Sequence, residues 1–168
     1  MILDVFSIFS IFSFLKFKDQ KYVGDPINAI RIFNDKEVDE LMVLDIMASK
    51  KNSEPNYSLI EEFAGECFMP LAYGGGVRTI DQASRIFGLG VEKICLQSAA
   101  LTDLSLVTRL AERFGSQSVV VSVDVKRNWR GKPQLYAAAK QKSIAMLWLE
   151  FAKRAAEVGA GEVLLNSV

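Results

Sequence analysis

The chain has 168 residues, of which 50% are apolar and 24% are charged, so it carries enough apolar surface for about one folded domain with a sizeable core. Its 20 Lys and Arg residues balance its 20 Asp and Glu residues, which argues against nucleic acid as a partner, because binding a phosphate backbone requires dense positive charge. No histidine is present, which excludes Ser-His-Asp and Cys-His catalysis and zinc sites of the HExxH type.

Residues 1–15 form an atypical apolar segment at the start of the chain. The run ILDVFSIFSIFSFL is shorter than the roughly 20 residues of a membrane-spanning helix. It also lacks the positive start and the small-residue cleavage site of a signal peptide. We therefore expect no membrane partner and a cytoplasmic location, in which Cys67 and Cys95 are reduced thiols because they lack CxxC spacing.

From residue 16 onward, short β-branched runs alternate with longer amphipathic stretches, which predicts parallel strands joined by helices. The predicted strands are residues 41–46, 68–73, 91–96, 118–123 and 162–165, with one more in the apolar segment. Helices are expected after the Asp25 and Pro26 cap, around residues 59–63, after the caps Thr79 and Thr102, and over residues 147–158. Residues 49–56 are predicted to be a polar loop, and residues 127–142 an exposed loop or a small hairpin.

No Pro-rich or Gly-rich linker divides these units, so residues 16–168 are predicted to form one α/β domain. A closed eight-stranded barrel usually needs about 250 residues, and at least about 200. The chain is too short for a closed barrel, and its last predicted strand has no covering helix after it.

Polar residues or glycines follow each predicted strand, where ligands bind in parallel α/β folds. These residues are Asp45, the run Gly74 to Gly76, Gln97 and Ser98, Asp124, and Asn166 and Ser167. Gly75 and Gly76 are candidates for presenting backbone N–H groups to a phosphate, although a tight turn explains glycines equally well. Gln97 and Ser98 are candidates for the same anion, or for ordinary helix capping.

Asp124 is the first candidate for acid/base catalysis, because it follows the apolar run VVVSV and burial raises the pKa of a carboxyl. The alternative is a structural ion pair with a lysine such as Lys126. Asp45 follows MVL in the same manner, and for it a structural role is favoured over orienting a substrate. At the opposite ends of the strands, Glu40, Lys93 and Glu162 indicate a solvated base when the sequence is taken alone.

Several segments, in this order, resemble the cyclase subunit of imidazole glycerol phosphate synthase: KYVGDPINAIRIFNDKEVDELMVLDIMASK, FMPLAYGGGVRTID, GVEKICLQSAAL, FGSQSVVVSVDVKR and EVGAGEVLLNSV. The resemblance runs from about residue 16 to residue 168. It implies a (β/α)8 TIM-barrel type of fold, here as an incomplete barrel of about five to six βα units. It also implies a cyclase, or lyase, of histidine biosynthesis that takes ammonia from a glutaminase subunit in a heterodimer. The family forms imidazole glycerol phosphate and AICAR from a phosphoribulosyl-formimino carboxamide ribotide, without a metal or cofactor.

Position by position, the resemblance makes Asp124 a catalytic aspartate and places Gly75, Gly76, Gln97 and Ser98 at a phosphate site. Asp45, Asn166 and Ser167 become candidates for orienting the substrate. The resemblance also changes the interpretation of the lower charges, because Glu40, Lys93 and Glu162 match an ammonia gate at the glutaminase-facing base.

The chain departs from the family at both ends. The family's first strand carries another catalytic aspartate in a CLD-x-x-x-G-x-x-V-K pattern, which MILDVFSIFSIFSFLKFKD replaces here, and the last two βα units have no counterpart. Two alternatives therefore stay open. One is the paralogous branch that amidinates an N-acetylated sugar in surface-polysaccharide biosynthesis, suggested by ECFMPLAYGGG and FGSQSVVVSVDVK. The other is a truncated, inactive fragment that retains only partner binding.

Overall fold

The computed structural model describes residues 8–9, 12–13, 21–22 and 26–168, with side chains from residue 26 onward except that of Lys50. The predicted cap Asp25 lies outside the described residues, as does most of the segment 1–15. Within this segment, β1 (Ile8–Phe9) is a short strand that runs parallel to the next strand of the sheet.

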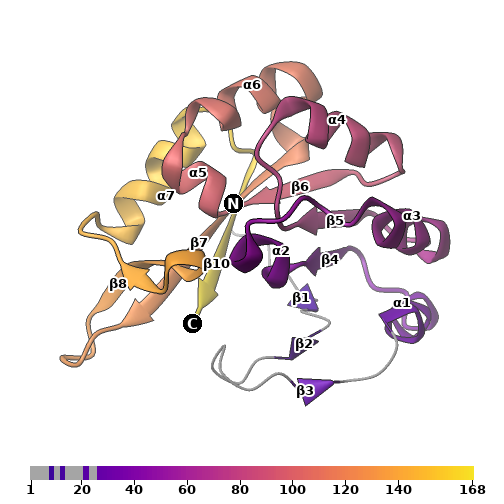
Figure 1. Cartoon of the computed structure of the whole chain (residues 1–168), viewed down its shortest axis with the longest axis horizontal. Coiled ribbons are helices and arrows are strands. Elements are labelled where there is room, and N and C mark those ends of the chain that lie inside the picture. The colour runs from indigo at the N-terminus through magenta and orange to yellow at the C-terminus, as the bar shows by residue number, and fades with distance from the viewer. Residues whose placement is uncertain (1–7, 10–11, 14–20, 23–25) are drawn as a thin grey trace.

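The main sheet joins parallel strands in the order β1, β4 (Leu41–Leu44), β5 (Leu71–Gly74), β6 (Lys93–Leu96), β7 (Val119–Arg127) and β10 (Glu162–Ser167). An antiparallel extension, β8 (Pro133–Ala137) and β9 (Lys142–Ser143), continues from β7, and β2 (Phe12–Ser13) pairs separately with β3 (Lys21–Tyr22). Figure 1 shows the parallel strands fanned into a curled sheet. The predicted α/β fold, an incomplete barrel of parallel strands, is confirmed.

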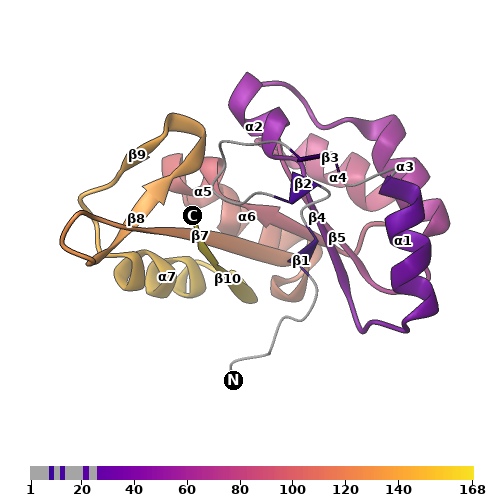
Figure 2. The same cartoon turned by 90° about the horizontal axis from the view of Figure 1, so that it is seen from below.

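Five longer helices cover the outer face of this sheet (Figures 1 and 2): α1 (Pro26–Asp35), α3 (Tyr57–Glu66), α4 (Ile80–Gly88), α6 (Ser105–Phe114) and α7 (Trp148–Glu157). The short helices α2 (Ile46–Lys51) and α5 (Ser98–Thr102) follow β4 and β6 at their carboxyl ends, and the 3-10 turns are η1 (Ser116–Ser118) and η2 (Ala138–Lys140). No helix among the described residues is long and apolar enough to cross a bilayer.

Alternation along each strand divides the buried apolar side chains into two sets, because successive strand residues point to opposite faces. In β4, Leu41 and Val43 join the core beneath the helices, whereas Met42 joins a smaller cluster on the inner face. The inner cluster consists of Met42, Ala72, Cys95, Val120 and Leu164, one residue from each of five strands. This inner face carries the polar groups of the site at one end and the charged groups at the other.

Two predictions of helix boundaries were wrong in detail, and the structure decides one prediction that was left open. The predicted loop 49–56 starts inside α2, because the Asp45 side chain accepts hydrogen bonds from the N–H groups of Met47 and Ala48 and so starts a helix there. Thr102 ends α5 instead of capping the next helix, and the side chain of Asp103 accepts from the N–H of Ser105 at the start of α6. The segment 127–142 was predicted to be an exposed loop or a small hairpin, and it is a hairpin. Its first strand is the end of β7, which continues to Arg127.

Candidate active site

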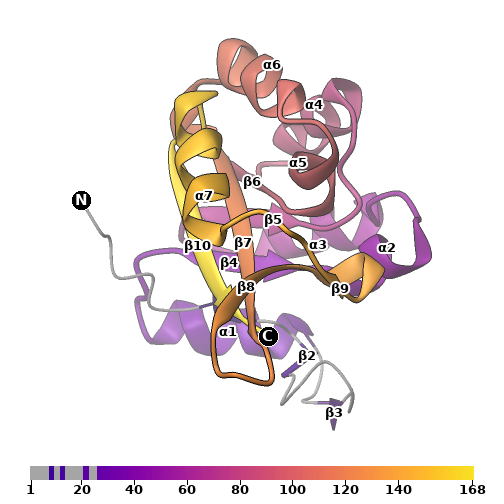
Figure 3. The same cartoon turned by 90° about the vertical axis from the view of Figure 1, so that its left-hand side faces the viewer.

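The parallel register brings the predicted site residues to one end of the sheet. Gly75 and Gly76 follow β5, Gln97 and Ser98 follow β6, and Asn166 of β10 lies directly beside Asp124 of β7. Asp124 does not end its strand, because β7 continues to Arg127 and forms the hairpin above it. Figure 3 shows β10 alongside β7, with the hairpin extending past the sheet.

Two adjoining cavities open at this end. The smaller, of about 80 Å³, is lined by Asp45, Ser122, Asp124 and Asn166 among others. The larger, of about 810 Å³, includes Gly76 and Ser98 in its wall. The two cavities have Ser49, Gly75, Cys95, Gln97 and Ala139 in common. The two cavities therefore adjoin, with Asp124 in the wall of the smaller one.

Asp124 is the buried carboxylate of this site, with only 5% of its surface exposed. Its Oδ1 accepts hydrogen bonds from Ser122 Oγ at 3.0 Å and from Asn166 Nδ2 at 3.3 Å. Burial raises the pKa of Asp124, and the two donors oppose that rise because they stabilise the charged form. The alternative pairing with Lys126 is not what the structure has, since the Lys126 ammonium lies over the Tyr136 ring, 4.7 Å from its centroid.

The Asp45 carboxylate points toward α2 and caps it, with both of its hydrogen bonds made by Oδ1, at 3.0 and 2.9 Å. It also lines the smaller cavity. The structural role favoured for Asp45 is therefore that of a cap at the start of α2. Ser167 lines neither cavity, because strand alternation puts it on the opposite face from Asn166.

The glycine run forms a turn that the fold itself requires. Gly75 and Gly76 have φ values of 137° and 72°, which side chains rarely adopt. A Cβ on Gly76 would lie 2.8 Å from the carbonyl oxygen of Ser53, and one on Gly75 would collide with the carbonyl oxygen of Asp45. The turn explanation therefore holds for both glycines whether or not an anion binds, and replacing them cannot test phosphate binding separately from folding.

The Gln97 side chain is occupied by protein contacts. Its Nε2 donates to the Tyr136 carbonyl at 3.0 Å, and its Oε1 accepts from Ser98 Oγ at 2.8 Å. Gln97 thereby ties β6 to the hairpin, while Ser98 lines the larger cavity.

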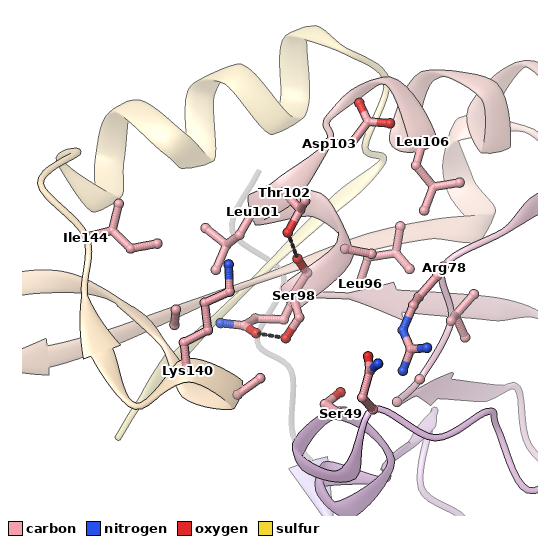
Figure 4. Close-up of a pocket in the computed structure, with 18 of the residues that line it drawn as sticks. Ser49, Arg78, Leu96, Ser98, Leu101, Thr102, Asp103, Leu106, Lys140 and Ile144 are labelled. Atoms are coloured by element: carbon pink, nitrogen blue, oxygen red, sulfur yellow. Dashed lines mark hydrogen bonds between the residues drawn. The ribbon is translucent and has the colours of Figure 1, made fainter.

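Three cationic residues of the larger cavity, Arg78, Lys140 and Lys142, were missed from the sequence. Figure 4 shows Arg78 and Lys140 on opposite sides of the cavity, with Ser98 between them. Arg78 donates to the Ser53 carbonyl at 2.9 Å, which holds it beside the glycine turn. Arg78 directly follows the motif GGGV and was open to recognition, whereas Lys140 lies in a segment that the sequence leaves as a loop.

Glu40, Lys93 and Glu162 meet at the opposite end of the sheet, where β4, β6 and β10 begin. Lys93 Nζ lies 2.7 Å from a carboxylate oxygen of each glutamate, and the exposed fractions of the three side chains are between 18% and 33%. Burial disfavours the charge on Lys93, but its hydrogen bonds to Glu162 and Glu40 outweigh burial and raise its pKa. The three residues form one bridged cluster, called here the lower charge cluster.

Neither cysteine forms a disulfide; Cys95 is buried and Cys67 is partly buried. Burial, with Asp124 nearby, raises the pKa of the Cys95 thiol to about 12, so Cys95 stays protonated beside the site. In the described part of the chain, no group of three or more Cys, Asp and Glu side chains is arranged to hold a metal ion.

A curled parallel sheet with helices outside and a polar site at the carboxyl ends of its strands defines a (β/α)-barrel type of protein. The family model described as "Histidine biosynthesis protein" matches residues 12–168. The chain belongs to this histidine biosynthesis protein family.

Individual relatives agree with this membership. The chain is 55% identical over 154 residues to "Putative imidazole glycerol phosphate synthase subunit hisF2" of Pseudomonas aeruginosa, covering 92% of this chain and 61% of that protein. The corresponding hisF3 protein of Vibrio vulnificus is 50% identical, with 92% and 60% covered. "Imidazole glycerol phosphate synthase subunit HisF" of Streptomyces avermitilis is 38% identical, with 92% and 61% covered. The chain thus spans about three fifths of the length of these relatives.

Proposed function

We propose that the chain acts in the cytoplasm as a cyclase-type subunit of a glutamine amidotransferase. In this role it uses ammonia from a glutaminase partner to form imidazole glycerol phosphate and AICAR from a phosphoribulosyl-formimino carboxamide ribotide. The observation that carries the proposal is the buried carboxylate of Asp124 in a small cavity that adjoins a larger, cation-flanked one. The names of the relatives support the same activity.

Asp124 is the group that moves a proton in this proposal. Its raised pKa brings a carboxyl closer to neutral pH, where an acid/base group works best. Its place in a cavity of about 80 Å³ admits the reacting end of a substrate but not the bulk of one. The remainder of the substrate occupies the larger cavity, whose volume of about 810 Å³ is in the usual range for small-molecule sites.

A phosphate group of the substrate binds in the larger cavity. The N–H groups of the turn at Gly75 and Gly76 are its hydrogen-bond donors, and Arg78 and Lys140 add positive charge on either side. Ser98 lines the same wall, but its hydroxyl proton is donated to Gln97 Oε1. The acidic residue of this wall, Asp103, is engaged by Ser105 and Arg109, which reduces its repulsion of an anion.

Replacing Lys140 by Met tests this anion site without disturbing the glycine turn. We expect Lys140→Met to weaken the binding of inorganic phosphate about three- to fivefold, the effect of losing one exposed charge contact, as measured by calorimetric titration at low salt. Lys132→Met removes an equally exposed charge from the hairpin, outside the cavity, and serves as the matched control. Equal effects of the two substitutions would reject the site.

The lower charge cluster is the proposed entry for ammonia. Glu40, Lys93 and Glu162 lie at the end of the sheet opposite Asp124, where a glutaminase would deliver ammonia to the inner face. In this proposal, the ion pairs from Lys93 to the two glutamates lie across the path of ammonia.

A second candidate function is the amidination of an N-acetylated sugar by the paralogous branch. The observation that favours it is the resemblance of the segments ECFMPLAYGGG and FGSQSVVVSVDVK to that branch. Both functions use the same route for ammonia and differ in the substrate at Asp124.

Genetic complementation separates the two functions. If the chain is the histidine cyclase, its gene is expected to restore growth without histidine to a cyclase-null strain that supplies the glutaminase. The Asp124→Asn gene is the matched control and should not restore growth. Growth that still requires histidine, from a chain that is folded and abundant in the cell, would count against the cyclase.

A further inference from the structure

Ser122 and Asp124 form a buried polar pair on the inner face of β7. They are two residues apart, so strand alternation puts both side chains on the same face. Each is 5% exposed, and they are the buried polar or charged residues of the described chain. Ser122 interrupts the run VVVSVDV, in which the neighbouring Val121 and Val123 point into the helix-covered core.

The hydrogen bonds of Asp124 treat its two oxygens differently. Ser122 Oγ and Asn166 Nδ2 both donate to Oδ1, at 3.0 and 3.3 Å. Among the described residues, no hydrogen bond reaches Oδ2. Oδ2 is not fully enclosed either, because the enclosed side-chain atoms without a partner are Glu40 Oε1 and Tyr73 Oη. Because Asp124 lines the small cavity, Oδ2 is the oxygen that is open to it.

We propose that Ser122 is a positioning residue: its hydroxyl holds Oδ1 of Asp124 and so leaves Oδ2 as the oxygen that exchanges a proton with the substrate. This inference rests on the acid/base role proposed for Asp124. It adds a residue that the sequence patterns did not identify. A serine inside a valine run is small enough for a buried position, and no motif in the sequence indicates a role for its hydroxyl.

The physical basis is a carboxylate that would otherwise be symmetric. Rotation about χ2 turns the plane of the carboxylate, and two donors to one oxygen hold that plane so that the other oxygen faces the cavity. A buried hydroxyl without a partner is costly, so the contact to Oδ1 is also the one that makes serine acceptable at this position. Ser122 donates from the same strand, which fixes the contact by backbone geometry alone.

Replacing Ser122 by Ala removes the hydroxyl and almost nothing else. The pKa of Asp124, followed by carbon-13 NMR of its carboxyl group, is expected to rise further in Ser122→Ala because a donor to the charged form is lost. Ser122→Thr keeps a hydroxyl at the same place and is expected to keep the wild-type titration. An unchanged pKa in Ser122→Ala would overturn the proposal, as would the same rise in Ser122→Thr.

The chain contains an exposed counterpart of this contact, which serves as the matched control. Ser105 Oγ donates to Asp103 Oδ2 at 2.9 Å on the surface. Ser105→Ala should shift the titration of Asp103 upward and leave that of Asp124 unchanged, and Ser122→Ala should do the reverse. A shift of Asp124 in both variants would show a general effect on the fold and reject a local role for Ser122.

Kinetics then tests the positioning itself. The substrate for this assay is that of the function supported by the complementation experiment. In Ser122→Ala, kcat is expected to fall about tenfold with KM nearly unchanged. The acid limb of the pH profile of turnover should move to higher pH. A kcat and pH profile equal to those of the wild type would reject positioning. A wild-type chain without turnover, in which the Asp124 titration still depends on Ser122, would instead reject the proposed function and leave the contact of Ser122 standing.

Discussion

Asp124→Asn is expected to reduce turnover by about 10² or more while making the protein more stable at neutral pH. The amide cannot exchange the proton, but it keeps an Oδ1 that accepts from Ser122 and Asn166. It also removes a buried charge. The opposite signs of the two effects separate a functional carboxylate from one that is retained for stability.

The sign of the stability effect follows from the pKa of Asp124. Because burial raises this pKa in the folded chain, the fold favours the protonated form. The resulting stability is fully present below the unfolded value of about 3.9 and is lost as the pH rises through the folded pKa. The gain in the free energy of unfolding in Asp124→Asn should therefore be larger at pH 8 than at pH 4, measured by urea unfolding.

Asp103→Asn provides the control with the opposite sign. Asp103 is exposed, and its hydrogen bonds with the hydroxyl and N–H of Ser105 lower its pKa, so its ionised form stabilises the fold at neutral pH. Its replacement should reduce stability slightly at pH 8, which is the opposite of the effect expected for Asp124→Asn. Unchanged turnover in Asp124→Asn, or an equal stability change at both pH values, would contradict the assignment of Asp124.

The second large effect is expected for Lys93→Met. Methionine keeps the length of the side chain but leaves Glu40 and Glu162 facing each other without the ammonium that lies 2.7 Å from both. We expect a loss of about 2 kcal/mol in the free energy of unfolding, below the 3–5 kcal/mol typical of a fully buried broken pair because these groups are partly exposed.

The cluster can be tested as a unit. Adding Glu40→Gln and Glu162→Gln to Lys93→Met removes the repulsion, so the triple variant should recover most of the lost stability. Lys36→Met, which removes an exposed charge elsewhere on the surface, should have almost no effect. If the cluster also admits ammonia, Lys93→Met should alter glutamine-dependent turnover more than turnover with added ammonium salt. A Lys93→Met protein as stable as the wild type would contradict the bridging role.

The position of Asp124 could be predicted because a carboxylate after a run of β-branched residues is a local signal. The meeting of Lys93 with Glu40 and Glu162 could also be expected, since charges at the starts of parallel strands share one end of the sheet. In both cases periodicity and strand direction determine the place of the residue.

The missed features depend on contacts between distant segments. Gln97 was placed at the anion site, but its amide is taken by Tyr136, which lies 39 residues away in a segment without a clear pattern. The role of Ser122 depends on which carboxylate oxygen it meets, and that is a matter of side-chain geometry. Thr102 fits a cap as well as Asp103 does, and sequence alone does not decide between two adjacent capping residues.

The hydrogen bond from Gln97 to the Tyr136 carbonyl connects the end of β6 to the hairpin that lies above the site. A side chain shorter by one methylene at position 97 would not span that distance, and the wall that carries Lys140 would lose its tether. Substitutions at position 97 and in the hairpin are therefore energetically coupled. To accommodate a ligand of another size, both segments would have to change together. A change in only one of them would break the hydrogen bond and make the hairpin less rigid.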